Sequence, residues 1–169
     1  MADEIINRVA SSKLKTIDLE DFYPDGKRVL IDLKDWLYEG LVLREKDFRN
    51  ALKSHDWSLY NNAYVAVNCS TDAIIPAWAF MLISVYLEPH AKIVVIGDLN
   101  DLETSLYQRI IHEMDVSEFK DLPVIIKGCA NKPVPTAAYV MITNKLRPIA
   151  KSIMYGEACS SVPLYKNKT

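Results

Sequence analysis

Short apolar runs alternate with longer helical patterns between residues 61 and 160. The runs are continuous and rich in β-branched residues, which is typical of strands covered on both faces. They read AYVAVN, KIVVIG, PVIIKG and KSIMYG. The segments between them have helical length and spacing, and they read PAWAFMLISVYL, DLETSLYQRIIHEM and PTAAYVMITNKL. These repeated strand–helix units predict an α/β fold with a mainly parallel sheet and helices on both faces.

Residues 1–60 follow a less regular pattern. The apolar spacing over residues 3–14 predicts a short helix. The segments TIDLEDF and RVLIDL alternate like strands on either side of a PDG turn, so they predict a β-hairpin. An amphipathic helix, REKDFRNALKS, follows them. We expect this N-terminal hairpin and helix to be added at one edge of the sheet.

The composition favours a single folded domain. Half of the residues are hydrophobic, and no low-complexity tract, long linker or break in composition interrupts the chain. We therefore expect one α/β domain over residues 1–169, made of a helix–hairpin–helix region (1–60), repeated strand–helix units (61–160) and a polar tail (161–169).

Charge and patterning exclude several classes of partner. A net charge of -2 gives no basic surplus for a phosphate backbone, so we expect no nucleic acid partner. The first residues lack the order of a signal peptide, and no apolar stretch reaches the roughly 20 residues of a membrane helix. Three cysteines in such a chain are expected to be reduced, which predicts a cytoplasmic protein without a membrane partner.

The three cysteines occupy similar positions in the pattern. Cys69, Cys129 and Cys159 each follow an apolar run and precede a polar turn. The carboxyl ends of parallel strands share one edge of a sheet, where open α/β folds bind ligands. We therefore expect three thiols along that edge, where they could bind zinc or iron.

A tetrahedral metal site needs one more ligand than the three thiols supply. Asp72, Glu157 and His55 are weaker candidates for this position, as are water and a second protein. The alternative is that the thiols are inert, because free cysteine often behaves as a small buried hydrophobe. Asp72 also suits an N-cap, because a helical pattern follows it closely. No C-x-x-C pair, H-x-x-x-H motif, G-x-S-x-G elbow or G-x-G-x-x-G loop is present.

Three segments of the chain are distinctive, and they read DWSLYNNAYVAVNCSTDAIIPAWAFML, PVIIKGCANKPVPTAAYVMITNKLRP and SIMYGEACSSVPLYK. They resemble the uncharacterised bacterial domain-of-unknown-function family number 2480, and the resemblance covers nearly the whole chain. It implies one small domain without an assigned activity. Its members are often encoded beside genes for sulfur-mobilisation iron–sulfur cluster assembly, so it also implies iron–sulfur assembly proteins as partners. The matching positions are Cys69, Asp72, Pro76, Trp78, Cys129, Pro135, Gly156, Glu157, Cys159 and Pro163.

Three functions remain open at this point. The first is a thiol or metal-site protein, serving as an accessory in metal or iron–sulfur metabolism. The second is an enzyme or small-ligand-binding protein that uses the same edge, with Cys69 or Cys129 as nucleophile and Asp72 or Glu157 as polar partner. The third is a structural or adaptor domain with inert buried thiols, which could self-associate as a homodimer or other homo-oligomer.

Overall fold

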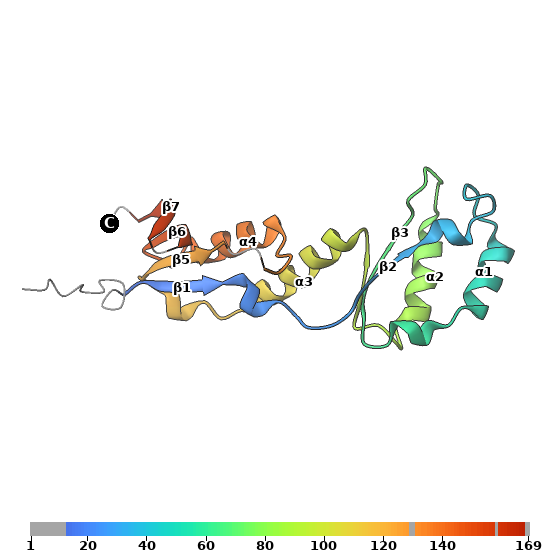
Figure 1. Ribbon diagram of the computed structural model, residues 1–169, viewed down its shortest axis with the longest axis horizontal. Coiled ribbons are helices and arrows are strands. Elements are labelled where there is room, and N and C mark those ends of the chain that lie inside the picture. The colour runs from blue at the N-terminus through green and yellow to red at the C-terminus, as the bar shows by residue number, and fades with distance from the viewer. Residues whose placement is uncertain (1–12, 129–130, 158, 168–169) are drawn as a thin grey trace, which may run out of the picture. The chain divides into compact units, whose positions relative to one another are not determined.

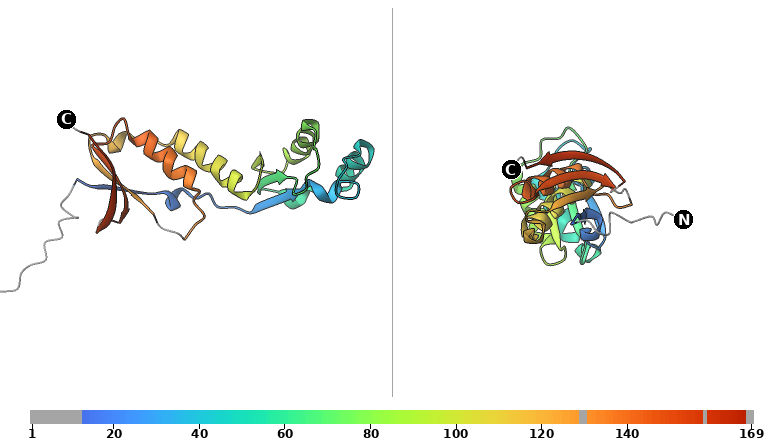
Figure 2. Two further views of the ribbon diagram at one scale, coloured as in Figure 1. Left: turned by 90° about the horizontal axis from the view of Figure 1, so that it is seen from above. Right: turned by 90° about the vertical axis from the view of Figure 1, so that its left-hand side faces the viewer.

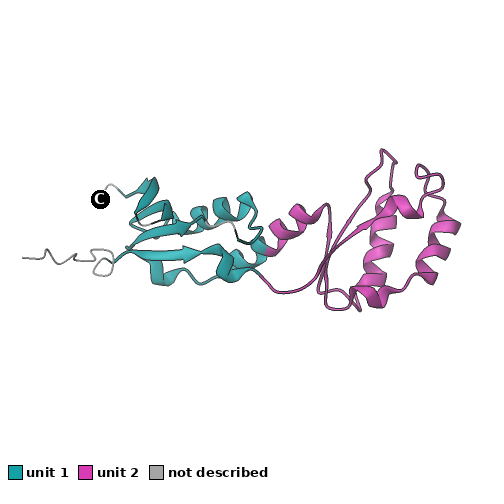
Figure 3. Cartoon of the chain, viewed as in Figure 1, with its two compact units in different colours: residues 1–23, 107–169 teal, residues 24–106 magenta. Residues whose placement is uncertain are grey.

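The computed structural model describes residues 13–128, 131–157 and 159–167 (Figure 1). The chain forms two compact units (Figure 3). Unit 1 combines residues 1–23 with residues 107–169, and unit 2 consists of residues 24–106. Unit 2 is thus inserted in the chain between the first strand and the remainder of unit 1. The division at its other end falls inside helix α3 (Leu99–Glu113).

Unit 2 holds a three-stranded parallel sheet in the order β2-β3-β4. The strands are β2 (Arg28–Asp32), β3 (Tyr64–Asn68) and β4 (Ile93–Ile96). The connecting helices are α1 (Glu45–Ser54), between β2 and β3, and α2 (Ala77–Leu87), between β3 and β4. The 3-10 helices are η2 (Leu33–Trp36), after β2, and η3 (Trp57–Tyr60), after α1.

The central strand β3 of unit 2 is buried on both faces, which accounts for its continuous apolar sequence. On one face, Val65 and Val67 pack with buried residues of α1 and α2. On the opposite face, Ala66 packs with Leu102 and Leu106 from the first half of α3. Full burial of each valine or leucine side chain in these clusters stabilises the fold by about 1.5–3 kcal/mol. The prediction of helices on both faces is therefore confirmed in unit 2.

Unit 1 holds a four-stranded sheet in the order β1-β5-β6-β7. The strands are β1 (Lys15–Asp18), β5 (Pro123–Lys127), β6 (Ser152–Glu157) and β7 (Ser160–Lys166). The first three are parallel, and β7 runs antiparallel beside β6 (Figure 2). The helices are η1 (Leu19–Phe22), the second half of α3, η4 (Ser117–Phe119) and α4 (Thr136–Leu146).

The core of unit 1 lies between its sheet and the helices α3 and α4. Val124 and Ile126 of the central strand β5 pack with Tyr107 of α3 and Ile142 of α4, and all four are fully buried. Tyr107 also donates its hydroxyl proton to the carbonyl oxygen of Leu19, at 2.8 Å. This bond satisfies the one polar group of the buried phenol, as burial in an apolar core requires.

The two units repeat one chain pattern, beginning with a strand that leads into a 3-10 helix. The sequences are IDLEDF in unit 1 and IDLKDW in unit 2. Asp18 and Asp32 hold equivalent positions there, and each accepts a hydrogen bond from the backbone N–H two residues further along. The aspartate therefore caps the 3-10 helix in the same way in both units.

The repeat continues through the helices α2 and α4. Each helix has 11 residues, is preceded by a proline and buries three residues at matching positions. These are Ala79 with Ala138, Ile83 with Ile142 and Leu87 with Leu146. The following segment repeats Pro89 as Pro148, Lys92 as Lys151 and Gly97 as Gly156.

The turns that lead into the central strands also match. Asn62 and Asp121 have positive φ angles of 57° and 58°, a region that asparagine and aspartate tolerate better than most residues. Asn62 donates its backbone N–H to His90 at 2.9 Å, and Asp121 donates to Ile149 at 2.9 Å. Because sequence, backbone conformation and hydrogen bonds all correspond, we treat the units as internal repeats.

The α/β class and the strand–helix alternation of residues 61–160 are confirmed, but the strands form two sheets instead of one. The predicted N-terminal hairpin is wrong. Strands β1 and β2 belong to different sheets, and each pairs in parallel with a strand from later in the chain. Alternation and a turn sequence identify strands, but they do not say which strands pair.

The prediction of a polar tail over residues 161–169 is also wrong, because most of it belongs to β7. Part of the helix expected over residues 3–14 and part of the predicted tail lie outside the described residues. The expected single domain stays a prediction, alongside the division into two compact units. Within the described residues, no helix is long and apolar enough to cross a membrane.

Candidate functional site

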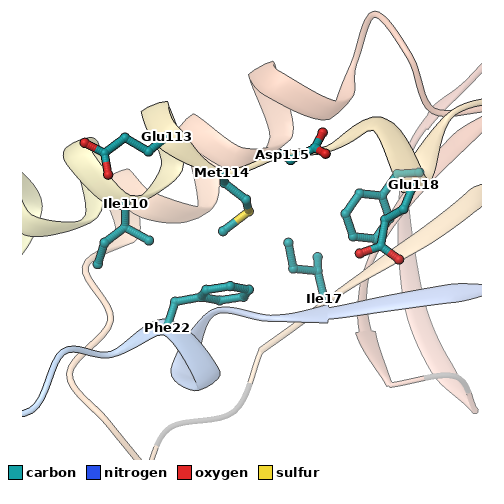
Figure 4. A pocket seen from close by; sticks show the side chains of 8 residues that line it. Ile17, Phe22, Ile110, Glu113, Met114, Asp115 and Glu118 are labelled. Carbon is teal, nitrogen blue, oxygen red and sulfur yellow. The ribbon is translucent and has the colours of Figure 1, made fainter.

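One candidate site is a pocket of about 430 Å³ in unit 1 (Figure 4). Its apolar lining comes from β1, η1, η4 and the end of α3: Ile17, Phe22, Ile110, Met114 and Phe119. Met114 follows α3 and projects toward Phe22 (Figure 4). The volume falls within the roughly 300–1,000 Å³ typical of small-molecule sites.

Carboxylates line the same pocket beside the apolar residues. They belong to Glu113, Asp115 and Glu118. Hydrogen bonds from the backbone N–H and the hydroxyl of Ser117, at 2.9 and 3.0 Å, lower the pKa of Asp115, so its negative charge is fixed at neutral pH. Glu118 forms an exposed ion pair with Lys15 at 3.1 Å. The pocket thus combines an apolar body with a net negative lining.

Comparison with unit 2 explains why the pocket is open. The counterparts of Phe22 and Met114 are Trp36 and His55, whose ring centroids lie 5.3 Å apart. Trp57 packs against both rings, at 6.1 and 4.7 Å, and its counterpart in unit 1 is Val116. Aromatic side chains therefore occupy in unit 2 the region that stays open in unit 1.

The last carbonyl groups of the helix before this region, α1 in unit 2 and α3 in unit 1, have different hydrogen-bond donors in the two units. In unit 2, the Trp57 indole N–H donates to the Leu52 carbonyl at 2.8 Å. In unit 1, the counterpart of Leu52 is Ile111, and its carbonyl accepts instead from Lys145 Nζ at 2.6 Å. Lys145 also donates to the His112 carbonyl at 2.7 Å. In unit 1 the Lys145 ammonium group thus donates to the carbonyl that Trp57 reaches in unit 2. A large side chain at position 116 is therefore not needed to hydrogen-bond the end of the helix.

The predicted cysteine edge is divided between two sheets. Cys69 follows β3 in unit 2, whereas Cys159 lies in the turn between β6 and β7 in unit 1. Cys129 lies outside the described residues. The expectation that all three thiols lie along the edge of one sheet is therefore wrong, because β3 belongs to a different sheet from β6.

The carboxyl edge of the unit 2 sheet contains a polar group without a partner. Asn68 ends β3, and its side-chain oxygen Oδ1 is buried with no hydrogen-bond partner among the described residues. Cys69, the next residue, is partly buried, with its sulfur 3.3 Å from the Thr71 hydroxyl. Burying a carbonyl oxygen without a donor costs about 1–3 kcal/mol, which marks the edge as a candidate ligand site.

Asp32 lies on the neighbouring strand, in register with Asn68. Burial alone would raise the pKa of Asp32, but hydrogen bonds from Ser70 and Lys34 outweigh it and lower the pKa from 3.8 to about 2. The Ser70 and Lys34 backbone N–H groups donate to Oδ1 at 3.1 Å each. Asp32 is therefore charged at neutral pH and ties the loop after β3 to the end of β2.

The corresponding edge of unit 1 is neutralised by ion pairing. Asp18, the counterpart of Asp32, lies 3.3 Å from Lys127 Nζ. Lys127 takes the place of Asn68 in this unit, since each is in register with the capping aspartate. Glu20, which is only 8% exposed, accepts a hydrogen bond from the Asn131 backbone N–H at 2.9 Å.

The weaker metal-ligand candidates are dispersed. Asp72 lies in the loop before α2, and the prediction that it caps this helix is wrong, because Pro76 is the N-cap and no side chain caps it. His55 lies among aromatic rings in unit 2, with Nε2 2.8 Å from the Tyr60 hydroxyl. Glu157 ends β6 in unit 1. Within residues 13–128, 131–157 and 159–167, no three histidine, cysteine, aspartate or glutamate side chains form a group that could hold a metal ion.

Sequence reasoning missed the pocket residues, because each looks like an ordinary core, turn or helix-end residue. One sequence feature could have found the pocket. Alignment of the two repeats places Val116 opposite Trp57, and loss of a large side chain at an otherwise repeated position predicts open space.

Fold and site together define a mixed α/β protein of two related units, with a carboxylate-lined pocket in one and an unpaired buried amide oxygen in the other. The chain belongs to the family described as "Protein of unknown function (DUF2480)", whose model matches residues 3–167. The family resemblance of the sequence is therefore confirmed. No curated protein and no solved structure gave a match.

Proposed function

We propose that the protein binds, in the pocket of unit 1, a ligand with an apolar body and a cationic group. The observation that carries this proposal is the contrast with unit 2, where aromatic side chains occupy the same region. An open apolar pocket at a place where the other repeat carries packed aromatic rings is a feature that core packing by itself does not require.

The residues that line the pocket indicate which chemical groups a ligand would need. Phe22, Met114 and Phe119 offer an apolar and aromatic surface, which suits a hydrocarbon or aromatic body. Glu113 and Asp115 favour an amine or guanidinium over a neutral or anionic group. A free small molecule and a lysine or arginine side chain of a partner protein share this chemistry.

The test uses three probes with similar bodies and different charges. Phenethylamine, 2-phenylethanol and 3-phenylpropionate are titrated separately into the full chain, and binding is followed by NMR shifts of the pocket residues. We expect the amine to bind about tenfold more tightly than the alcohol, because a charged hydrogen bond contributes about 1.5 kcal/mol. The carboxylate is expected to bind more weakly than either. Equal affinity for all three probes would contradict the cationic specificity.

Val116→Trp introduces, next in sequence to the pocket residue Asp115, the side chain that unit 2 carries at this position, and it is designed to fill the pocket. We expect this variant to fold and to lose amine binding. Val162→Trp is the control, because Val162 is 59% exposed on β7 and does not line the pocket. Retained binding in Val116→Trp, with its melting temperature unchanged, would locate the ligand elsewhere.

A second candidate function is favoured by the unpaired Asn68 oxygen beside Cys69. A zinc or iron ion bound there would receive a thiolate and an amide oxygen, with Asp72 as a further oxygen donor. The remaining ligands would come from water or from a second protein, and an iron–sulfur assembly protein is the partner that this hypothesis favours. The role would be that of an accessory in metal or iron–sulfur metabolism.

Elemental analysis of protein purified anaerobically, without chelator or histidine tag, tests this second function. We expect about one zinc or iron per chain. Cys69→Ser and Asn68→Leu should each lose the metal, while Cys159→Ser, the control, should keep it. Asn68→Leu should also raise the free energy of unfolding of the metal-free protein by about 1 kcal/mol, because it removes an unsatisfied buried group. Wild-type protein without metal under these conditions would exclude the function.

A further inference from the structure

The two repeats differ in what lies beside their last parallel strand. In unit 1, β7 pairs antiparallel with β6. In unit 2, β4 is the last strand of the sheet, and no described strand pairs with its outer edge. β4 has the sequence IVVI, and no proline or charged residue within it protects the edge. An open apolar edge of this kind is a template for pairing with another strand.

Unit 1 shows what surrounds a strand that pairs beside the last parallel strand. A groove of about 290 Å³ is lined by residues of α4 and by one residue each of β6 and β7. Tyr139, Val140 and Thr143 of α4 line it together with Tyr155 of β6 and Leu164 of β7. A strand added beside the last parallel strand therefore lies next to this side of the helix.

The same side of α2 in unit 2 is apolar and exposed. Met81 and Ile96, the counterparts of Val140 and Tyr155, are 66% and 53% exposed. Val85 is 69% exposed, whereas its counterpart in α4 is the polar residue Asn144. No charged residue occurs from Ala73 to Leu87. A helix that is apolar all round is normally covered on every side.

We propose that the covering partner is a second copy of this chain, which pairs its own β4 antiparallel with this β4. Two-fold symmetry then joins the two unit 2 sheets into one continuous six-stranded sheet. The charges suit this pairing. When it is centred on Val95, Lys92 of one copy lies opposite Asp98 of the other, at both ends of the paired segment.

Helix spacing supports the same arrangement. α2 connects β3 to β4 and packs on the sheet beside β4. Strands lie roughly 4.8 Å apart, so a helix α2 centred over the gap between β3 and β4 would have its two-fold mate about 10 Å away. This matches the 8–10 Å separation of packed helices. Met81 and Val85 of both copies then meet, and the absence of charge on α2 leaves no repulsion between identical faces.

The experiment is sedimentation equilibrium of the full chain over a range of concentrations. We expect a dimer, and we expect Met81→Glu/Val85→Glu to weaken self-association about 100-fold, because like charges are forced together at the two-fold axis. The control is Val140→Glu/Asn144→Glu on α4, which places the same charges at matching positions of unit 1 and should leave the dimer intact. Both double variants alter exposed positions, so folding is expected to persist.

Hydrogen exchange distinguishes strand pairing from helix contact alone. The amides of β4 should exchange more slowly as protein concentration rises and the dimer forms. A wild-type monomer at 100 μM, or a dimer that survives the α2 substitutions, would overturn the proposal. Exchange in β4 that is independent of concentration would overturn the strand pairing. The proposal is independent of the pocket in unit 1, so either can fail without the other.

Discussion

Units 1 and 2 share their interior and differ at their surface. Ile83 in α2 and Ile142 in α4 occupy equivalent positions and are both fully buried. On the outer side of the same helices, Val85 in unit 2 corresponds to Asn144 in unit 1. The comparison teaches that the buried positions maintain a common fold, while the outer positions determine what each unit can bind.

The units also diverge directly after the repeated glycine. In unit 2, Asp98 follows Gly97 and accepts hydrogen bonds from the backbone N–H groups of Asn100 and Asp101, at 2.8 and 2.9 Å. These bonds satisfy the first turn of α3, so a helix begins there. In unit 1 the sequence EACSSVPLYK follows the glycine instead, and Pro163 is unfavourable in the interior of a helix. The chain therefore returns as β7.

The largest expected loss of stability comes from substitutions in the two cores. It tests whether the two units unfold together, as one cooperative structure. Ile83→Ala and Ile142→Ala should each lower the free energy of unfolding by about 3–4 kcal/mol, because each leaves a cavity in a closed core. All three tryptophans lie in unit 2, so fluorescence follows that unit while circular dichroism follows both. The single-domain prediction requires both variants to shift both signals equally in urea.

A fluorescence transition that Ile142→Ala leaves unchanged would contradict this prediction. It would show that unit 2 unfolds independently of unit 1. Val140→Ala is a suitable control, because Val140 lies on the same helix but is 55% exposed.

A smaller effect is expected from an ion pair that only unit 2 has. Arg28 Nε lies 2.7 Å from Glu103 Oε1, and the two side chains are 13% and 8% exposed. Glu103→Gln should cost about 2–3 kcal/mol, because it leaves the guanidinium poorly paired in a mostly buried site. Urea unfolding at pH 7 measures the loss.

Unit 1 has Leu14 at the position of Arg28, which suggests a second variant. The double replacement Arg28→Leu/Glu103→Leu should cost less than Glu103→Gln, because apolar residues of similar size can substitute for a buried ion pair. A double variant that is less stable than the single one would show that the pair itself is a net source of stability.

The smallest expected loss of stability comes from replacing Asp32, and its size depends on pH. Its pKa of about 2 lies below the ordinary value of 3.8, so its contribution to stability is present above pH 4 and is lost as the pH falls toward 2. Asp32→Asn should therefore cost about 1–2 kcal/mol at pH 7 and little near pH 2. Urea unfolding of both proteins across this range checks the sign. A cost that is the same at both pH values would contradict the assignment.

The sequence predicted the strand–helix units well, because apolar runs such as YVAVN in β3 and VIIK in β5 report burial directly. Strand partners were not predictable in the same way. TIDLEDF and RVLIDL look like a hairpin, yet β1 pairs with β5 and β2 with β3. This choice depends on contacts between distant segments, which local alternation does not encode.

The candidate site was less predictable than the fold. Cys69, Cys129 and Cys159 share a local pattern, but which sheet each cysteine adjoins depends on strand pairing. The pocket was missed because its lining residues form a site only where the small side chain of Val116 replaces a large aromatic one. A missing group leaves no motif, so only comparison with Trp57 in the other repeat exposes it.

The insertion of unit 2 within unit 1 has a consequence for synthesis on the ribosome. Lys15 of β1 and Glu118, which form an ion pair beside the pocket, are 103 residues apart in the chain. At roughly 5–20 residues per second, β1 waits about 5–20 s for the rest of its sheet to be translated. Unit 2 is complete before then, because its residues are contiguous. β1 leaves the ribosome before the other described strands of its sheet but pairs only after its partner β5 is made. A nascent chain stalled after residue 106 would therefore carry β1 as an unpaired strand, accessible to other proteins.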